Sequence, residues 1–264
     1  MTEHIIVVTD LDGSLLDHHS YSWEEAREAL SLLRSEGIPL VLCSSKTAAE
    51  MHAWRKKLDI RYPFIVENGG AIYLPPDASS GKDWKKHVLG MNRADIKSRL
   101  LTIRDAGFSF KGFLEMTVAE VMDATGLDEA SSELAMMREF TEPLLWQDEE
   151  SKKPDFGKQL RQQGLEVVEG GRFLHVSSGC DKGRALLWLK AYYKNEFGCE
   201  PVVIALGDSG NDVSMLEAAD RAVVVKSPVR TYPAVNHMDT YYTKLEGPAG
   251  WNEAILNYMT NRKG

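Results

Sequence analysis

The strongest constraint in this sequence is the stretch Asp10-Leu11-Asp12-Gly13, which directly follows an apolar run at residues 4–9. The run has the composition of a buried strand, because it is rich in isoleucine and valine. Two carboxylates therefore stand at the C-terminal end of a predicted strand, with a glycine behind them. In open parallel sheets, this edge is where ligands bind.

The two carboxylates are expected to have different surroundings. Asp10 ends the strand, whereas Asp12 already lies in the turn that follows. This division suits a nucleophile or metal ligand beside a proton donor. The alternative is an ordinary polar surface turn, because an Asp-x-Asp-Gly stretch is common when taken alone.

The composition narrows the class of protein. The chain has 264 residues and a hydrophobic share of 43%, which suits one large domain or a core with an insert. Its net charge of −8 argues against a nucleic-acid binder, which would normally carry a basic stripe. The spacing of Cys43, Cys180 and Cys199 suggests neither a disulfide framework nor a zinc site.

The sequence gives no sign of a membrane segment. No stretch approaches the roughly 18 consecutive apolar residues that a spanning helix needs. The amino terminus enters its first predicted strand within a few residues, without the charged region of a signal peptide. We therefore expect a soluble, cytoplasmic protein.

Strands and helices alternate in the first part of the chain. The apolar runs at 4–9 and 38–43 are each followed by a helical pattern, which implies parallel strands with right-handed crossovers. Apolar runs at 64–66 and 71–74 flank an Asn-Gly-Gly turn and predict a hairpin.

The region at 83–171 differs in texture. It follows a linker rich in proline, serine and glycine at 75–81, and its helical and extended patterns predict a small α+β insert. The expected helices are 93–105, 117–125, 128–137 and 154–163, and the expected extended segments are 108–111, 144–146 and 165–168.

Patterns typical of a parallel sheet return at residue 172. Strands at 172–176, 201–206 and 222–225 alternate with helices, and a final helix carries Trp251 on its apolar face. The predicted fold class is α/β, with a doubly wound, mostly parallel Rossmann-like core sheet and an inserted α+β cap domain. The predicted domains are 1–82 (core), 83–171 (cap) and 172–264 (core).

Four loops that follow apolar runs carry carboxylate, hydroxyl or lysine side chains that suit the same chemistry. Carboxylates that converge at one sheet edge repel one another without a cation, and oxygen ligands at this density imply Mg²⁺. A lysine and a serine hydroxyl nearby would bind a phosphoryl group. The residues therefore predict metal-assisted phosphoryl transfer, although each alone could be a helix cap or a solvated charge. In chain order they are Asp10 and Asp12, Ser44 and Lys46, Lys182, and Asp208 and Asp212.

The same residues resemble the four motifs of the haloacid dehalogenase-like phosphohydrolases. They occur in the family's order, and Gly207-Asp208-Ser209-Gly210-Asn211-Asp212 is the most specific of them. The insert lies between the second and third motifs, which resembles the subclass with a C2-type cap. One departure is Ser14, where threonine is usual after Asp-x-Asp-Gly.

The resemblance implies a role for each motif residue. Asp10 would attack phosphorus, Asp12 would act as general acid and base, Ser44 would hydrogen-bond the phosphoryl oxygens, and Lys182 would offset negative charge. The implied cofactor is Mg²⁺, and its implied ligands are Asp10, the carbonyl of Asp12, Asp208, and Asn211 or Asp212.

Further stretches, such as residues 63–70 and 247–251, resemble the mannosyl-3-phosphoglycerate phosphatase subfamily. The implied substrate carries a carboxylate, a phosphate and sugar hydroxyls, and we expect no nucleic-acid or membrane partner. Glu142, Arg138 and Arg172 could equally form surface ion pairs, and His175 could be a core histidine. The expected substrate-binding residues are Lys46, Glu67, Asn68, Arg138, Glu142, Arg172 and His175.

Other functions remain open at this point. A glucosyl-3-phosphoglycerate or other sugar-phosphate phosphatase would use the same chemistry, and a phosphomannomutase-like transferase would return the phosphoryl group. A catalytically silent binding protein could also have this fold. The sequence leaves the natural sugar and the oligomeric state undetermined.

Overall fold

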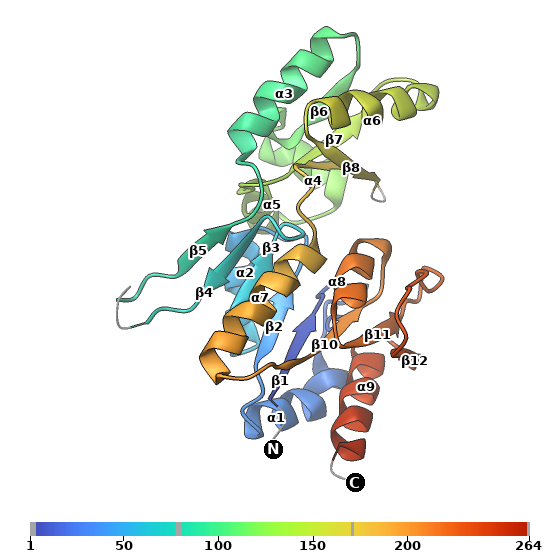
Figure 1. Ribbon diagram of the computed structural model, residues 1–264. Helices are drawn as coiled ribbons and strands as arrows, with labels where there is room; N and C mark the ends of the chain where they lie inside the picture. The colour runs from blue at the N-terminus through green and yellow to red at the C-terminus, as the bar shows by residue number, and fades with distance from the viewer. Residues whose placement is uncertain (1–3, 78–80, 170–171, 263–264) are drawn as a thin grey trace.

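The structure is a computed structural model that describes residues 4–77, 81–169 and 172–262. It contains two β-sheets, one above the other in Figure 1. The large sheet has eight strands in the order β12-β11-β10-β1-β2-β3-β4-β5, and the small sheet has four in the order β6-β7-β9-β8. The chain is therefore an α/β core with an α+β insert, as predicted.

The core strands from β12 to β3 are all parallel, and β4 and β5 extend the large sheet as an antiparallel hairpin. The elements of the core are β1 (Ile5–Thr9), α1 (Arg27–Ser35), β2 (Leu40–Cys43), α2 (Ala48–Lys57), β3 (Phe64–Val66), β4 (Ala71–Leu74), β5 (Lys85–Val88), α7 (Lys182–Phe197), β10 (Val202–Gly207), α8 (Val213–Ala218), β11 (Arg221–Lys226), β12 (Thr240–Glu246) and α9 (Gly247–Asn261).

The insert forms an antiparallel sheet with its own helices. Its elements are α3 (Arg93–Asp105), β6 (Phe110–Gly112), α4 (Val118–Thr125), α5 (Glu129–Met136), β7 (Glu142–Trp146), α6 (Lys153–Gln162), β8 (Glu166–Glu169) and β9 (Leu174–Ser177). The four helices predicted in this region are all present.

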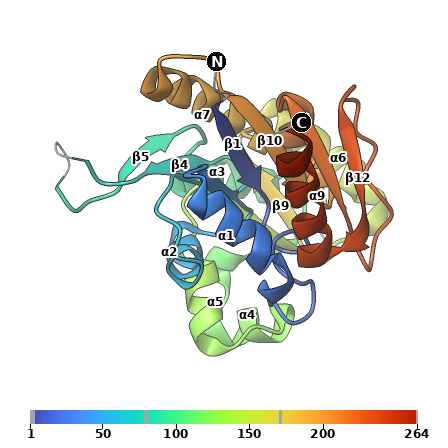
Figure 2. The same ribbon diagram turned by 90° about the horizontal axis from the view of Figure 1, so that it is seen from below.

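Alternate residues of β1, β2, β3, β4, β10 and β11 belong to two hydrophobic clusters, one on each face of the large sheet. Val7 of β1 packs in the cluster that contains α1 and α9, whereas Val8 packs in the cluster with α7 and α8. Figure 2 shows α7 on one side of the sheet and α1 and α9 on the other. Both faces are covered, which is why the core strands are apolar at consecutive positions.

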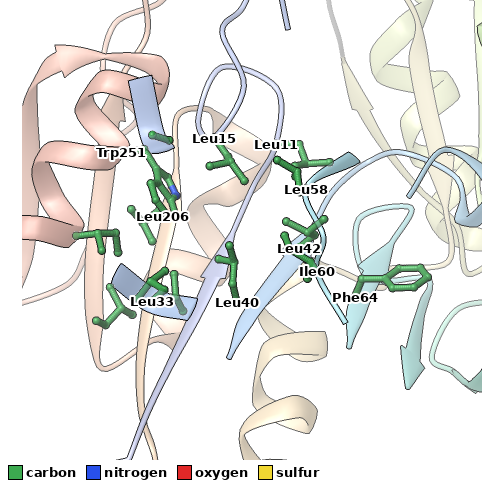
Figure 3. Close-up of a cluster of buried hydrophobic side chains, with 14 of the residues drawn as sticks. Leu11, Leu15, Leu33, Leu40, Leu42, Leu58, Ile60, Phe64, Leu206 and Trp251 are labelled. Carbon is green, nitrogen blue, oxygen red and sulfur yellow. The ribbon is translucent and has the colours of Figure 1, made fainter. Parts of the chain in front are cut away.

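Trp251 of α9 belongs to the first cluster and lies close to Leu15 and Leu206 (Figure 3). Its indole is fully buried, and its Nε1 donates a hydrogen bond to Thr9 Oγ1 at 3.0 Å. Thr9 Oγ1 in turn donates to the carbonyl oxygen of Asp10 at 2.8 Å. The final helix thus holds the backbone at the end of β1.

Local sequence signals account for several helix ends. Thr47 and Glu50 form the predicted capping box of α2, with Thr47 N donating to Glu50 Oε2 at 2.8 Å. Asp181 caps α7 by accepting from Arg184 N at 2.9 Å, and Gly198 ends α7 with a φ of +70°.

One strand lies in a different sheet from the one predicted. The strand predicted for the core at 172–176 is β9, which pairs with β7 and β8 in the small sheet. Leu174 and Val176 are buried in the insert's own cluster, while His175 between them is only half-buried. This alternation is typical of an antiparallel sheet that is covered on one face.

The predicted linker at 75–81, part of which lies outside the described residues, joins two strands of the same sheet. β5 pairs with β4 in the large sheet, so the insert begins only after β5. Segments 89–92 and 178–181 therefore connect the two sheets, whereas the predicted domain bounds lie at 82/83 and 171/172. We therefore propose a core and a cap domain that are joined by these two connecting segments.

Candidate active site

The predicted catalytic residues lie at one edge of the large sheet. Asp10 follows β1, Ser44 follows β2 and Asp208 follows β10, and these strands are parallel neighbours in the order β10-β1-β2. Their C-terminal ends therefore place three polar side chains side by side. Asp10 N also donates to Leu206 O of β10 at 2.9 Å, which extends the pairing of the two strands up to the site.

Lys182 joins two carboxylates at the centre of this edge. Its Nζ lies 2.6 Å from Asp10 Oδ1 and 2.6 Å from Asp212 Oδ1, and its side chain is 0% exposed. Lys182 is the first residue of α7, so its cation stands at the positive end of a helix dipole. Ion pairing with two acids compensates for both this position and the burial.

Both oxygens of Asp212 accept hydrogen bonds in this arrangement, and Oδ1 does so from Lys182. Its second oxygen, Oδ2, accepts from Asp208 N at 3.1 Å, from Ser209 N at 3.0 Å and from Ser209 Oγ at 3.0 Å. Asp212 therefore fixes the loop that carries Asp208 and, at the same time, orients Lys182.

Two glycines allow the loops to approach each other. Gly13 has a φ of +86°, and a Cβ on it would lie 2.7 Å from Asp208 Oδ2. A Cβ on Gly207 would lie 2.4 Å from the Asp212 Cβ. Side chains at either position would separate the aspartates.

Burial makes the charged forms of these carboxylates costly. It raises the pKa of Asp10 to about 8, with Asp212 and Asp12 adding to the rise and Lys182 opposing it. Burial and the Asp212 charge raise the pKa of Asp208 to about 6. Burial would lower the pKa of Lys182, but the two neighbouring carboxylates raise it above its ordinary value.

The same carboxylates form a group that fits a metal ion. Asp10, Asp208 and Asp212 each offer an oxygen, and these oxygens lie within 4.8 Å of one another. Asp208 Oδ1 and Asp12 Oδ1 are buried and have no hydrogen-bond partner among the described residues. Buried acceptor oxygens without donors, beside raised carboxyl pKa values, are suited to a hard divalent cation.

Asp12 differs from Asp10 as predicted. Its Oδ2 forms an ion pair with Lys46 Nζ at 2.7 Å, and its side chain is 36% exposed, against 8% for Asp10. The Asp12 charge raises the pKa of Lys46, although burial alone would lower it. One carboxylate is thus enclosed beside a buried lysine, and the other faces an open space.

That space is a cavity of about 570 Å³ between the edge of the large sheet and the small sheet. Asp10, Asp12 and Asp208 line it from the core, while Val168, Glu169 and His175 line it from the insert. Val168 and His175 are paired residues of β8 and β9. The insert therefore covers the carboxylates with the face of its sheet.

Two of the residues predicted to bind substrate line this cavity, Asn68 and His175. Asn68 has a φ of +55° in the hairpin turn, and its Oδ1 accepts from Asn211 Nδ2 at 3.2 Å. His175 Nδ1 is buried and has no partner among the described residues, and burial lowers the pKa of His175 to about 4. His175 is therefore a neutral imidazole in the wall of the cavity.

Glu67 holds the insert instead of lining the cavity. One of its oxygens accepts from Glu139 N at 2.7 Å, and the other accepts from Phe140 N at 3.1 Å and Thr141 Oγ1 at 2.6 Å. Its side chain is 1% exposed. Glu67 is therefore enclosed by the insert and does not face the cavity.

Three further predicted residues are also engaged within the protein. Arg138 donates to Ser45 O at 2.8 Å, Glu142 pairs with Arg93 at 2.5 Å inside the insert, and Arg172 donates to Ala124 O at 2.7 Å. Their partners are main-chain atoms or residues distant in sequence, so a short sequence motif cannot reveal these interactions. Lys46 and Ser44 do not line the cavity but contact or adjoin residues that do. Lys46 pairs with Asp12, and Ser44 is buried next to Ser45 in the chain.

Several lining residues were not predicted from sequence, among them His18, Ser45 and Arg230. Arg230 lies four residues after the end of β11, which is a parallel strand of the large sheet. The rule that ligands bind beyond the C-terminal ends of such strands could have indicated it.

Comparison with known proteins agrees with this arrangement. Residues 7–243 match the model of the haloacid dehalogenase-like hydrolase family. A glucosyl-3-phosphoglycerate/mannosyl-3-phosphoglycerate phosphatase of Methanococcoides burtonii is 38% identical, over 96% of this chain and 97% of the relative. A phosphatase of the same description from Persephonella marina is 36% identical, over 97% of each chain.

Solved structures share the fold at low sequence identity. A haloacid dehalogenase-like hydrolase from Bacteroides thetaiotaomicron superposes with a TM-score of 0.66 at 22% identity, over 97% of this chain and all of that one. The sucrose-phosphatase of Synechocystis, solved with sucrose and phosphate, gives a TM-score of 0.65 at 16% identity, over 98% and 99% of the two chains.

Proposed function

Because this chain belongs to the haloacid dehalogenase-like hydrolases, we propose that it is a magnesium-dependent phosphatase of mannosyl-3-phosphoglycerate and glucosyl-3-phosphoglycerate. The reaction would release phosphate and leave the glycosylglycerate. The observation that carries the chemistry is the buried Asp10–Lys182–Asp212 cluster beside the unpartnered oxygens of Asp12 and Asp208. The substrates are proposed from the two phosphatases that are 36–38% identical along nearly the whole chain.

In the first step, an Asp10 oxygen attacks phosphorus. The bond between phosphorus and the C3 oxygen of the glycerate breaks, and its electron pair stays on that oxygen. Asp12, which faces the cavity, supplies the proton to the leaving oxygen. The product of this step is an aspartyl-phosphate and the free glycosylglycerate.

In the second step, water attacks the aspartyl-phosphate. Asp12 is now a carboxylate and accepts the proton of that water, which regenerates Asp10 and releases phosphate. Lys46, paired with Asp12 at 2.7 Å, keeps this carboxylate directed along the cavity wall. Lys182 offsets the charge of Asp10 and the phosphoryl group, and Ser44 is the proposed donor to phosphoryl oxygens.

The proposed ligands of Mg²⁺ are Asp10, the carbonyl oxygen of Asp12, Asp208 and, directly or through water, Asn211 or Asp212. When bound, the ion would favour the ionised form of Asp10 and offset charge on the phosphoryl oxygens. Because Asp212 already accepts from Lys182 and three donors of the Asp208 loop, we assign it to orienting these residues.

Asn68 and His175 are the proposed contacts to the leaving group, since both line the cavity. Asn68 is held by Asn211, so its amide has a fixed direction. His175 is neutral, so its ring can bond a hydroxyl without a change of charge. Both are neutral groups, so they can hydrogen-bond sugar hydroxyls without adding a charge to the cavity.

The test is phosphate release, measured with Mg²⁺ for mannosyl-3-phosphoglycerate, glucosyl-3-phosphoglycerate, mannose 6-phosphate and sucrose 6-phosphate. We expect kcat/KM for the two glycosyl-phosphoglycerates to exceed that for the simple sugar phosphates by about two orders of magnitude, because a hydrogen-bonding site rejects ligands that leave its groups unpaired. Equal values across the panel would contradict the substrate assignment and leave a general sugar-phosphate phosphatase. Product analysis showing an isomerised sugar phosphate without free phosphate would indicate the transferase.

A further inference from the structure

The wall of the active-site cavity contains very little positive charge. Its lining includes the carboxylates of Asp10, Asp12, Asp208 and Glu169. Within the described part of the chain, Arg230 is the one lysine or arginine that lines it. A ligand with more than one negative charge therefore meets a strongly acidic cavity with a single arginine at its edge.

The proposed substrates carry two anionic groups, a phosphate and the carboxylate of the glycerate. A divalent cation at the aspartates and the buried Lys182 would offset the charge of the phosphate. Lys182 is not available to the carboxylate, because it has both Asp10 and Asp212 as partners at 2.6 Å. The divalent cation would be occupied by the aspartates and the phosphate. A carboxylate bound in such a cavity needs a cation of its own.

The other basic residues near the cavity already have partners. Lys46 pairs with Asp12 at 2.7 Å. Arg138 donates to Ser45 O and to Thr141 Oγ1, each at 2.8 Å.

Arg172 is bound to a main-chain carbonyl of α4 and does not line the cavity.

Arg230 differs from these residues. Its side chain is exposed and makes no hydrogen bond or ion pair with the residues that the structure describes. It lies in the loop after β11, at the same sheet edge as Asp208, whose carboxyl feels its charge. The guanidinium is close enough to act on the site electrostatically, and its five N–H donors are free.

We propose that Arg230 binds the carboxylate of the glycerate leaving group and thereby makes the enzyme prefer phosphate monoesters that carry a carboxylate. The proposal rests on the proposed phosphatase function. An arginine fork matches the two oxygens of a carboxylate, and a lysine in its place would give only a point charge. Arg230 is thus assigned to specificity and takes no part in the transfer of the proton or the phosphoryl group.

Two small ligands isolate this contribution. 3-Phosphoglycerate and glycerol 3-phosphate differ only at C1, which is a carboxylate in the first and a hydroxymethyl group in the second. Each is tested as an inhibitor of Mg²⁺-dependent p-nitrophenyl phosphate hydrolysis by the wild type, Arg230→Ala, Arg230→Lys and Arg61→Ala. Arg61 is an exposed arginine between α2 and β3, at the opposite edge of the sheet, so its variant controls for loss of one surface charge.

The wild type and Arg61→Ala should bind 3-phosphoglycerate about 10- to 100-fold more tightly than glycerol 3-phosphate, as expected for a hydrogen-bonded charged pair. Arg230→Ala should abolish this preference and leave binding of glycerol 3-phosphate within about twofold, since the phosphate contacts remain. Arg230→Lys should retain part of the preference.

Two results would overturn this inference but leave the proposed phosphatase function intact. One is an Arg230→Ala variant that keeps the preference, and the other is equal weakening of both ligands, which would assign Arg230 to the phosphate. A wild-type protein that hydrolyses no phosphate monoester would instead contradict the proposed function, and the inference with it.

Discussion

Lys182 and the two aspartates around it form a buried charged cluster. Its burial lowers the stability of the fold, so a functional role is the better explanation for its presence. Removing three charges from water costs several kcal/mol per ion, and their attraction offsets this cost incompletely. Apolar residues of similar size would fill the space without such a cost. The cluster therefore indicates a site in which the ionisation of Asp10 matters more than the stability of the fold.

His175 gives a pH-dependent prediction. Burial first, and then the charge of Arg138, lower the pKa of His175 from 6.5 to about 4. Above pH 6.5 the imidazole is neutral in both the folded and unfolded states. Between pH 6.5 and pH 4 the unfolded chain binds a proton that the folded protein does not, so stability falls by on the order of 3 kcal/mol.

The measurement is urea unfolding at pH 7.5 and pH 4.5 for the wild type and His175→Gln. The variant cannot take up this proton, so its loss of stability at pH 4.5 should be smaller than that of the wild type by about 2–3 kcal/mol. An equal loss in both proteins would show that the imidazole is not held neutral by its surroundings.

The motif residues could be predicted because they lie directly after a strand, in the loop that follows it, or at the start of a helix. Asp10, Lys182 and Asp208 need only the position of the strand or helix next to them to be placed at the sheet edge. Glu67 and Glu142 were expected to face the substrate, but their partners lie dozens of residues away in the chain. No pattern in the sequence indicates such a pairing, because it depends on how the insert docks.

At the level of elements, the buried strands and the helices were the predictable part. Strand β9 was assigned to the core, although its alternating burial is the pattern of an antiparallel sheet. Strands β5 and β12 were not expected at all. They form the two edges of the large sheet, where exposed and charged residues replace the hydrophobic pattern that identifies a strand.

The segment 138–141 of the insert is anchored in the core, and this anchoring gives a second prediction. Phe140 packs in the core cluster, and Glu67 accepts three hydrogen bonds from residues 139–141. Replacing Glu67 by alanine leaves two N–H groups and one hydroxyl without their acceptor. We expect Glu67→Ala to lower the free energy of unfolding by about 3 kcal/mol.

Urea denaturation measures this loss, with Glu133→Ala as the control. Glu133 lies on an exposed position of α5, so its removal should change stability by less than about 0.5 kcal/mol. If the two variants were equally stable, the bonds of Glu67 would contribute nothing to holding the insert. Hydrogen exchange at Glu139 and Phe140 would then be unchanged in Glu67→Ala as well.

For the molecule as a whole, the relation between the two sheets determines what the site can do. The large sheet brings its carboxylates to one edge, and the small sheet lies over them with Val168 and His175. The cavity between the sheets has room for a phosphate ester with a sugar. Within the described residues, no helix is both long and apolar enough to cross a membrane.

The measurement that tests the account most directly is phosphate release from mannosyl-3-phosphoglycerate by the wild type, Asp10→Asn and Asp123→Asn, each with Mg²⁺ and with EDTA. Asp123 is an exposed carboxylate of α4 and serves as the matched control. We predict that EDTA, or Asp10→Asn in a variant that still folds, lowers the rate at least about 10³-fold, while Asp123→Asn keeps the wild-type rate. Release that persists in Asp10→Asn or in EDTA would contradict a phosphatase built on Asp10 and a metal ion.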